Sequence, residues 1–391
     1  MQSQSLSASR YFEGSNKDRG RRVDRRRLCV VLVSALALLT AACGSGDSGS
    51  SEGDTTGKGT VIVYGSTSME DLLAGSIADR MSSEDISIKH DPLLSSTALT
   101  KSIAERRSPK ASLVLVDTVS YLKGASAGLW DTIDVEAAPA VESVPAGTGL
   151  DAFENRGVAV YGLTLALMYR EDLLKKHDIP FPTSFADLAD PRLKGHVGIP
   201  AVTSSSGIYT LVALAHANGG DESNIDPGFA QVKELKDSGQ LGPIMESTSD
   251  MNEALQRGDV WVAVQGSHGA LSFASSNEDV GWTYPTEGMP VDFFLAAIPK
   301  DAPNKVGAEK LINELLSSES QSDIAKEIYG LPVIEDAKNA DIVPGEEELE
   351  RGRVSFGSLM TATGSQLMDW TAVNSQINEW YKRWTSTVLS D

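Results

Sequence analysis

The chain of 391 residues contains few cysteines and few prolines, and both shortages narrow the class of protein. Its 2 cysteines, Cys29 and Cys43, allow one disulfide at most. Its 16 prolines, with 41% hydrophobic and 23% charged residues, are not the composition of a disordered chain. We therefore expect a globular protein, and at roughly 100–200 residues per domain the length favours two lobes.

Positive charge is also scarce. The chain has 34 Lys and Arg residues against 54 Asp and Glu residues, a formal net charge of −20. Such an acidic surface repels nucleic acid and anionic lipid. We expect no nucleic-acid partner.

The N-terminal segment has the pattern of an export signal. Six arginines between Arg19 and Arg27 precede the apolar run "LCVVLVSALALLTAA" at 28–42. This run is shorter than the about 20 residues that a spanning helix needs, and it ends in small residues directly before Cys43. We predict a signal peptide over 1–42, with an uncleaved membrane anchor as the alternative. The arginines permit either the general or the twin-arginine export route.

The residues around Cys43 resemble the lipobox of bacterial lipoproteins. The motif reads "LLTAAC" and is followed by Gly44, with Thr40 where a leucine is usual. The resemblance implies that Cys43 is acylated, for example with palmitate, and becomes the first residue of the mature chain. Residues 43–59 have almost no apolar content and are predicted to be a flexible linker. Cys29 lies inside the signal, so the mature chain can form no disulfide.

The rest of the chain has the element order of an α/β protein. Short β-rich apolar runs, such as 60–66 and 111–117, alternate with amphipathic stretches, one of them a helix with Ser68 as its expected cap. The run 157–170 is apolar for most of its length and contains Gly162, which suits an extended segment crossing between two lobes. The C-terminal stripe is predicted to be a helix packed on the core, with Trp370, Val373, Ile377, Trp380 and Trp384 on one face.

A row of four hydroxyl side chains, 203–206, stands between a predicted strand ending at Pro200 and a helix starting near Gly207. A nucleophile elbow needs a glycine two residues before the serine and another two after it, and no serine of the row has both. A linker does not fit between a strand and a helix. The row is therefore predicted to be a ligand loop at a helix N-terminus, which favours carboxylate, phosphate or phosphonate groups. Hydroxyls also accept hydrogen bonds from ammonium groups.

Several segments resemble the extracellular solute-binding proteins of ABC importers, in the subgroup of spermidine/putrescine and ferric-iron receptors. They are "LVLVDTVSYLKGASAGLWDTID", "TSFADLADPRLKGHVGIP", "NEALQRGDVWVAVQGS", "YPTEGMPVDFFLAAIPKDAPNKVGAEKLINELLSSE" and "YGLPV", in the family's order and spacing over about residues 60–340.

The resemblance implies an α/β, two-lobed periplasmic-binding-protein-like fold of type II, with the ligand cleft between lobes joined by crossing strands. Lobe one is expected over 60–158 plus 297–391, and lobe two, with the crossover strands, over 159–296. The family implies no enzyme activity and no cofactor. It implies a monomer, tethered outside the cytoplasm by the lipid, that delivers a small solute to ABC permease subunits.

Candidate ligand residues follow from the rule that ligands sit beyond the carboxyl ends of strands. The rule and the family's ligand loops select Ser66, Thr67, Ser68, Asp117, Thr118, Tyr161, Thr203, Ser204, Ser205, Ser206, Gly207, Gln265, Ser267 and Asp292. Asp117, Asp292 and Tyr161 can together hold an ammonium group. The alternative is structural: Asp117 caps the following helix, and Asp292 is paired within the protein.

The substrate stays open between two classes. In the pattern of the polyamine receptors an aromatic residue is followed two positions later by an acid. Here the order is reversed, with Asp292 first and Phe294 second, so both groups needed for a polyamine-like amine are still present. No adjacent tyrosines and no histidines at metal-ligand spacing occur, so we expect no metal site. An anionic or zwitterionic solute, such as a phosphonate or carboxylate, is the alternative. From another class, a secreted serine hydrolase using a serine of the row is the competing hypothesis.

Overall fold

The computed structural model describes residues 56–145, 148–334 and 365–390. The predicted signal peptide at 1–42, most of the linker and the expected lipid site at Cys43 lie outside the described residues. Within the described ranges, no helix has both the length and the apolar character needed to cross a bilayer.

The described chain forms two β-sheets. The first has six strands: β1 (Gly59–Gly65), β2 (Ile86–Asp91), β3 (Leu113–Asp117), β4 (Gly157–Leu163), β10 (Pro290–Ala297) and β11 (Gln366–Leu367). The second has five: β5 (Leu165–Arg170), β6 (Val197–Pro200), β7 (Leu241–Met245), β8 (Val262–Gly266) and β9 (Val280–Thr283). β1 pairs in parallel with β2 and β3, whereas β10 pairs antiparallel with β3 and β4.

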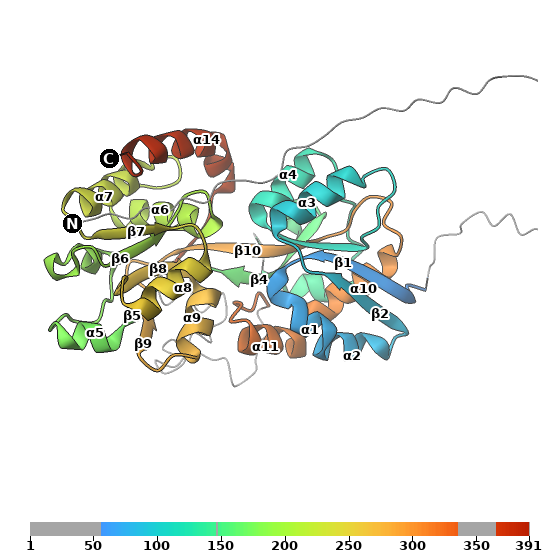
Figure 1. Ribbon diagram of the computed structural model, residues 1–391. Helices are drawn as coiled ribbons and strands as arrows, with labels where there is room; N and C mark the ends of the chain where they lie inside the picture. The colour runs from blue at the N-terminus through green and yellow to red at the C-terminus, as the bar shows by residue number, and fades with distance from the viewer. Residues whose placement is uncertain (1–55, 146–147, 335–364, 391) are drawn as a thin grey trace, which may run out of the picture. The chain divides into compact units, whose positions relative to one another are not determined.

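Helices cover both faces of each sheet. In the first half they are α1 (Glu70–Ala74), α2 (Ser76–Ser82), α3 (Ser95–Ala104), α4 (Thr118–Ser126), α10 (Lys305–Leu315) and α11 (Ser318–Glu327). In the second they are α5 (Glu171–Lys176), α6 (Ser205–Ala217), α7 (Asp226–Asp237), α8 (Thr248–Arg257) and α9 (Ser267–Ser275). Figure 1 shows α3 and α4 above the first sheet, with α1 and α2 below it; α6 and α7 lie above the second sheet, with α8 and α9 below.

This layering explains the sequence pattern of the strands. Leu113, Val114, Leu115 and Val116 are all at most 1% exposed, so β3 is buried on both of its faces. A strand between two helix layers reads as a continuous apolar run rather than an alternating one. The expected α/β class is confirmed.

The chain crosses between the sheets twice within the described ranges. It leaves the first sheet after β4 and enters the second at β5, with only Thr164 between the two strands. It returns between β9 and β10, where the Thr164 hydroxyl donates to the Pro290 carbonyl at 2.8 Å. Gly162 lies inside β4, and its backbone N–H and carbonyl both form hydrogen bonds with the backbone of Leu331.

The segment after β1 differs from expectation. Ser68 does not cap a helix; the chain instead makes a 3-10 turn at Thr67–Met69, and α1 starts without a side-chain cap. Ser66 precedes this turn in the left-handed region at φ 44°. Its hydroxyl lies 3.0 Å from the hydroxyl of Tyr161, so this strained conformation directs the side chain toward β4.

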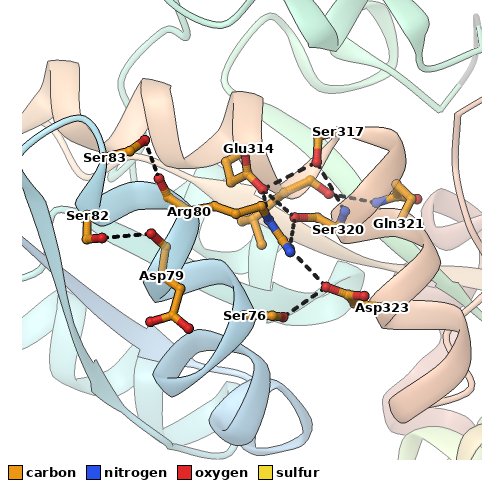
Figure 2. A network of polar contacts seen from close by, with 11 residues as sticks. Ser76, Asp79, Arg80, Ser82, Ser83, Glu314, Ser317, Ser320, Gln321 and Asp323 are labelled. Atoms are coloured by element: carbon orange, nitrogen blue, oxygen red, sulfur yellow. Dashed lines mark hydrogen bonds and ion pairs between the residues drawn. The ribbon is translucent and has the colours of Figure 1, made fainter.

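A polar network joins α2 to α10 and α11 (Figure 2). Arg80 on α2 contacts Glu314 at 2.5 Å and Asp323 at 3.0 Å, and also donates to Ser320. On α11, the fully buried Gln321 donates to the carbonyls of Val160 and Leu315 and accepts from the amide of Val333. One side chain therefore satisfies three backbone groups, one of them next to Tyr161.

The C-terminal helix α14 (Trp370–Thr387) contacts both halves of the molecule. The predicted stripe is confirmed, because Trp370, Val373, Trp380 and Trp384 are buried. The helix packs against α4, and its Trp384 ring meets Phe229 of α7 edge-on at 6.5 Å. Arg383 pairs with Asp226 on α7, and Gln376 donates to the Glu222 carbonyl. Although we expected 297–391 in lobe one, α14 also binds the helices of the second sheet.

The three hydrogen bonds of Gln321 allow a direct test. Gln321→Leu should lower the free energy of unfolding by about 3 kcal/mol, because it leaves three buried backbone groups without partners. Urea denaturation followed by circular dichroism measures the change. Gln256→Leu, at an exposed position of α8, is the matched control and should stay within about 0.5 kcal/mol of the wild type. Equal losses in both variants would contradict the role assigned to Gln321.

Candidate functional site

The candidate residues of the first sheet gather at the carboxyl ends of β1 and β3. Tyr161 is 2% exposed, its ring stacks on Phe294 with centroids 5.0 Å apart, and its hydroxyl contacts Ser66. Burial, followed by the nearby charge of Asp117, holds the pKa of Tyr161 far above its usual value, while the hydroxyls of Ser66 and Ser68 oppose this shift. The ring therefore stays a neutral phenol. Thr67 is exposed on the turn beside this group.

Asp117 is the half-buried carboxylate of the group. Its Oδ1 accepts a hydrogen bond from the backbone amide of Ser120 at 2.8 Å. Asp117 therefore caps α4, which is the structural role that we gave as the alternative for this residue. Burial, followed by the charge of Asp292, raises the pKa of the Tyr209 hydroxyl, and the charge of Asp117 adds to this shift. Asp117 thus lies near two phenols, Tyr161 on β4 and Tyr209 on α6.

Asp292 on β10 is 1% exposed, and its carboxylate accepts hydrogen bonds from two side chains. The Tyr209 hydroxyl, from α6, donates to Oδ2 at 2.5 Å, and the indole N–H of Trp370, from α14, donates to Oδ1 at 2.7 Å. Thr118 supports the same strand by donating to the Phe293 carbonyl at 3.3 Å. Burial raises the pKa of Asp292 to about 6, although hydrogen bonds from Thr118, Tyr209 and Trp370 favour its ionised form. Both carboxylate oxygens thus accept hydrogen bonds from protein donors. This is the structural role, pairing within the protein, that we gave as the alternative for Asp292.

The hydroxyl row forms the N-terminus of α6. Ser204 is the cap: its Oγ accepts from the Gly207 amide at 3.1 Å and donates to the Ala201 carbonyl. Gly207 must be glycine, because a Cβ there would lie 1.9 Å from the Ala201 carbonyl oxygen. Thr203 is exposed and donates to Glu246 at 3.2 Å. Ser205 lies one turn before Tyr209 and interacts with its hydroxyl.

The junction of β8 and α9 carries buried polar atoms without partners. Six buried side-chain polar atoms in the described ranges lack a hydrogen bond, and three of them are here: Gln265 Oε1, Ser267 Oγ and His268 Nδ1. Gln265 uses only its amide nitrogen, toward Asn252 at 3.3 Å. Burial lowers the pKa of His268, so its imidazole is neutral at pH 7. Leaving such atoms without partners is costly, so this junction is a candidate place for a water molecule or a solute.

This junction adjoins the hydroxyl row. A Cβ on Gly266 would lie 3.1 Å from Ser206 Oγ and 3.7 Å from His268 Nδ1. Ser204, Ser206 and Gln265 line one small hollow of about 50 Å³, together with Glu246. No lysine or arginine is among the described residues that line it. The hollow therefore presents hydroxyls, an amide and a carboxylate beside the apolar side chains of Pro200, Met245, Met251 and Val264, but no positive side chain.

The predicted residues thus form two groups linked by Tyr209. Ser66, Ser68, Asp117 and Tyr161 belong to the first sheet; Ser204, Ser206, Gln265 and Ser267 belong to the second. Sequence reasoning missed four residues: Tyr209, Glu246, His268 and Trp370. Two of them could have been found from the sequence, because Tyr209 lies one helical turn after Ser205 and His268 directly follows Ser267. No sequence pattern indicates that Trp370 pairs with Asp292.

Two other chemistries find no support in the described ranges. No cluster of three or more His, Cys, Asp or Glu side chains suited to a metal occurs there. No described histidine forms a hydrogen bond with a serine of the row, and Ser204 is engaged as a helix cap. The Nε2 atom of His216 lies 3.0 Å from a carboxylate oxygen of Glu222.

Comparisons with known proteins agree on one family. A family model described as bacterial extracellular solute-binding protein matches residues 81–350. A periplasmic protein of Salmonella paratyphi A, named for binding 2-aminoethylphosphonate, is 21% identical over 285 residues, covering 71% of this chain and 77% of that protein.

Solved structures share the fold. The spermidine/putrescine substrate-binding protein PotD of Streptococcus pneumoniae aligns with a TM-score of 0.68 at 16% identity, over 83% of this chain and 99% of that one. An ABC transporter protein of Clostridium perfringens aligns with a TM-score of 0.67 at 22% identity, over 84% and 99%. These likenesses confirm the expected two-lobed fold.

The buried carboxylate of Asp292 predicts a pH dependence of stability. Its pKa is near 3.8 when unfolded and about 6 when folded, so between these values the folded state binds more protons than the unfolded state. Lowering the pH from 7 to 5 should therefore stabilise the wild type relative to Asp292→Asn, by up to about 3 kcal/mol over the full window. Denaturant unfolding of both proteins at each pH measures the difference, in which other titrating groups cancel. Parallel pH profiles would show that Asp292 does not titrate in this way.

Proposed function

Because the chain belongs to the family of bacterial extracellular solute-binding proteins, we propose that it captures a small polar solute outside the membrane and delivers it to the permease of an ABC importer. One observation carries the site: the buried atoms Gln265 Oε1, Ser267 Oγ and His268 Nδ1 lack partners beside the hydroxyl row. A bound solute would satisfy them. A transport receptor, unlike an enzyme, needs only this binding and no reacting group.

The proposed ligand residues are those predicted from the sequence, with refined roles. Asp117, Tyr161, Ser66 and Ser68 face the solute from the first sheet; Ser205, Ser206, Gln265 and Ser267, with His268 added, face it from the second. Asp292 and Thr118 hold the crossing strand, Ser204 and Gly207 shape the start of α6, and Thr67 and Thr203 lie at the exposed rim. The lobe boundaries given above belong to the same proposal.

The proposed solute carries an amine. Gln265 Oε1 can only accept a hydrogen bond, so the solute must present a donor to it. The carboxylate of Glu246 lines the hollow, which has no positive side chain. Asp117 offers a second carboxylate in the group of the first sheet. The N-terminus of α6 adds a place for a negative group. A polyamine-like amine fits the acceptor Gln265 and the carboxylates. A zwitterion, such as the compound for which the Salmonella relative is named, uses these groups for its amine and the N-terminus of α6 for its negative group.

We also propose the predicted mode of attachment. The lipobox-like motif at Cys43 would be cleaved and acylated, which would hold a monomeric receptor at the outer face of the membrane near its permease.

A panel of solutes tests the function. Native mass spectrometry of the purified mature protein should first reveal any retained solute. Putrescine, spermidine, 2-aminoethylphosphonate and inorganic phosphate are then compared by thermal denaturation. A true ligand at 100 times its Kd should stabilise the protein by about 2.7 kcal/mol. If no member of the panel stabilises the protein, while a fluorophosphonate labels a serine of the row and an ester is turned over, the protein is a hydrolase.

A substitution tests the assigned amine contact. Asp117→Asn should weaken binding of the identified amine by about 1.5–3 kcal/mol, the usual range for a charged hydrogen bond, and should not weaken binding of inorganic phosphate, because it removes a negative charge. Isothermal titration calorimetry measures both affinities. Asp237→Asn, at an exposed position of α7, is the matched control. Equal affinities for the amine in wild type and Asp117→Asn would place the amine elsewhere.

A further inference from the structure

The hollow beside the hydroxyl row is too small to enclose a whole solute. Its volume of about 50 Å³ lies far below the roughly 300–1,000 Å³ of pockets that enclose small molecules. One water molecule needs at least about 10–15 Å³, so the hollow has room for a group of a few atoms. It therefore fits one end of a solute, and its lining indicates the chemistry of that end.

Three side chains that line the hollow carry acceptor oxygens. Gln265 is 3% exposed, and its Oε1 has no partner because only its amide nitrogen is bonded, to Asn252. The Ser206 hydroxyl can accept a hydrogen bond as well as donate one. The exposed carboxylate of Glu246 accepts from Thr203 and forms no ion pair with any described residue. The hollow thus runs from an exposed negative charge to a buried, unpaired acceptor.

A primary ammonium group matches this set of oxygens. It has three N–H donors and no acceptor, so one nitrogen can donate to all three side chains. An ionised phosphonate or carboxylate has only acceptors, so it would leave Gln265 Oε1 unpaired and would be repelled by Glu246. The positive end of the α6 dipole opposes a cation here, but it amounts to about half a charge, whereas Glu246 carries a whole one.

We propose that the hollow selects a primary ammonium group over its N-methylated forms. Each methyl group replaces an N–H donor, so a fully methylated nitrogen leaves the buried Oε1 of Gln265 without a partner. The methylene group beside a primary ammonium can instead pack on the apolar side chains of Met245 and Met251. Gln265 therefore determines specificity, and Glu246 adds attraction at the exposed side.

This inference rests on the proposed function, because it assigns one end of the same solute site. It also orients a zwitterionic solute: the ammonium group occupies the hollow, and the negative group lies outside it. Polyamines and amino-phosphonates with a free amine are thus accepted, whereas their trimethylated analogues are excluded.

Two cations of equal charge test the proposal in the purified protein, labelled with ¹⁵N at its glutamine side chains. The NMR signal of the Gln265 amide is identified by its absence from Gln265→Leu. Methylammonium chloride should shift this signal saturably and bind at least about tenfold more tightly than tetramethylammonium chloride, the ratio expected for one charged hydrogen bond. Sodium phosphate at the same ionic strength should not shift it. Because the signal belongs to Gln265, binding of either cation elsewhere does not count.

A charge variant tests the second acceptor. Glu246→Gln should weaken methylammonium binding about threefold, a modest change because water screens the exposed carboxylate. Glu234→Gln, which removes an exposed carboxylate of α7, is the matched control and should leave the affinity unchanged.

Equal shifts by the two cations, a shift by phosphate, or no shift by methylammonium would overturn the proposal. These outcomes differ from a failure of the proposed function. A stabilising solute without a primary amine would support the receptor and overturn the role of the hollow. Selective binding of methylammonium, with no solute found in the panel or by native mass spectrometry, would support the ammonium hollow and contradict the receptor.

Discussion

The carboxylate of Asp292 is the group on which the arrangement of the molecule most depends. It is buried in β10, the strand by which the chain returns to the first sheet, and its oxygens accept from Tyr209 of the second half and Trp370 of α14. A buried carboxylate costs several kcal/mol unless donors surround it. Removing either donor would leave one carboxylate oxygen without its side-chain partner. One side chain therefore ties three segments far apart in the sequence to one arrangement.

The same hydrogen bonds connect the proposed solute site to the crossing strands. Tyr209 donates a hydrogen bond to Asp292 and interacts with Ser205 of the hydroxyl row. The charge of Asp117 interacts electrostatically with the hydroxyls of both Tyr209 and Tyr161. On the far side of β4, Gln321 fixes the carbonyl beside Tyr161. A solute that displaces a hydroxyl of the row would thus act on the link between the two sheets. In a two-lobed fold, that link is where binding can influence the relation of the lobes.

The sequence predicted what is decided by neighbours along the chain. The alternation of strands and helices, the strand before the hydroxyl row and the tryptophan stripe follow from local patterns, and the structure confirms them. The prediction of a helix capped by Ser68 was wrong, because the hydroxyl of Ser66 contacts that of Tyr161, which is 95 residues away in the sequence. The partner of Asp292 on α14 is 78 residues distant and was assigned to the core. An acid inside an apolar strand signals that it needs a donor, but the sequence gives no means of choosing which one.

The unpartnered atoms at the β8–α9 junction also limit the proposed solute. Satisfying three buried polar atoms is worth about 1–3 kcal/mol each, whereas a micromolar Kd requires about 8 kcal/mol in addition to the cost of association. These contacts alone are too few for tight binding. The remainder must come from the first sheet, where Asp117 offers a charge and the stacked rings of Tyr161 and Phe294 offer an aromatic surface. A solute that reaches only one sheet would lose a large share of this energy, so high affinity requires a molecule long enough to contact both.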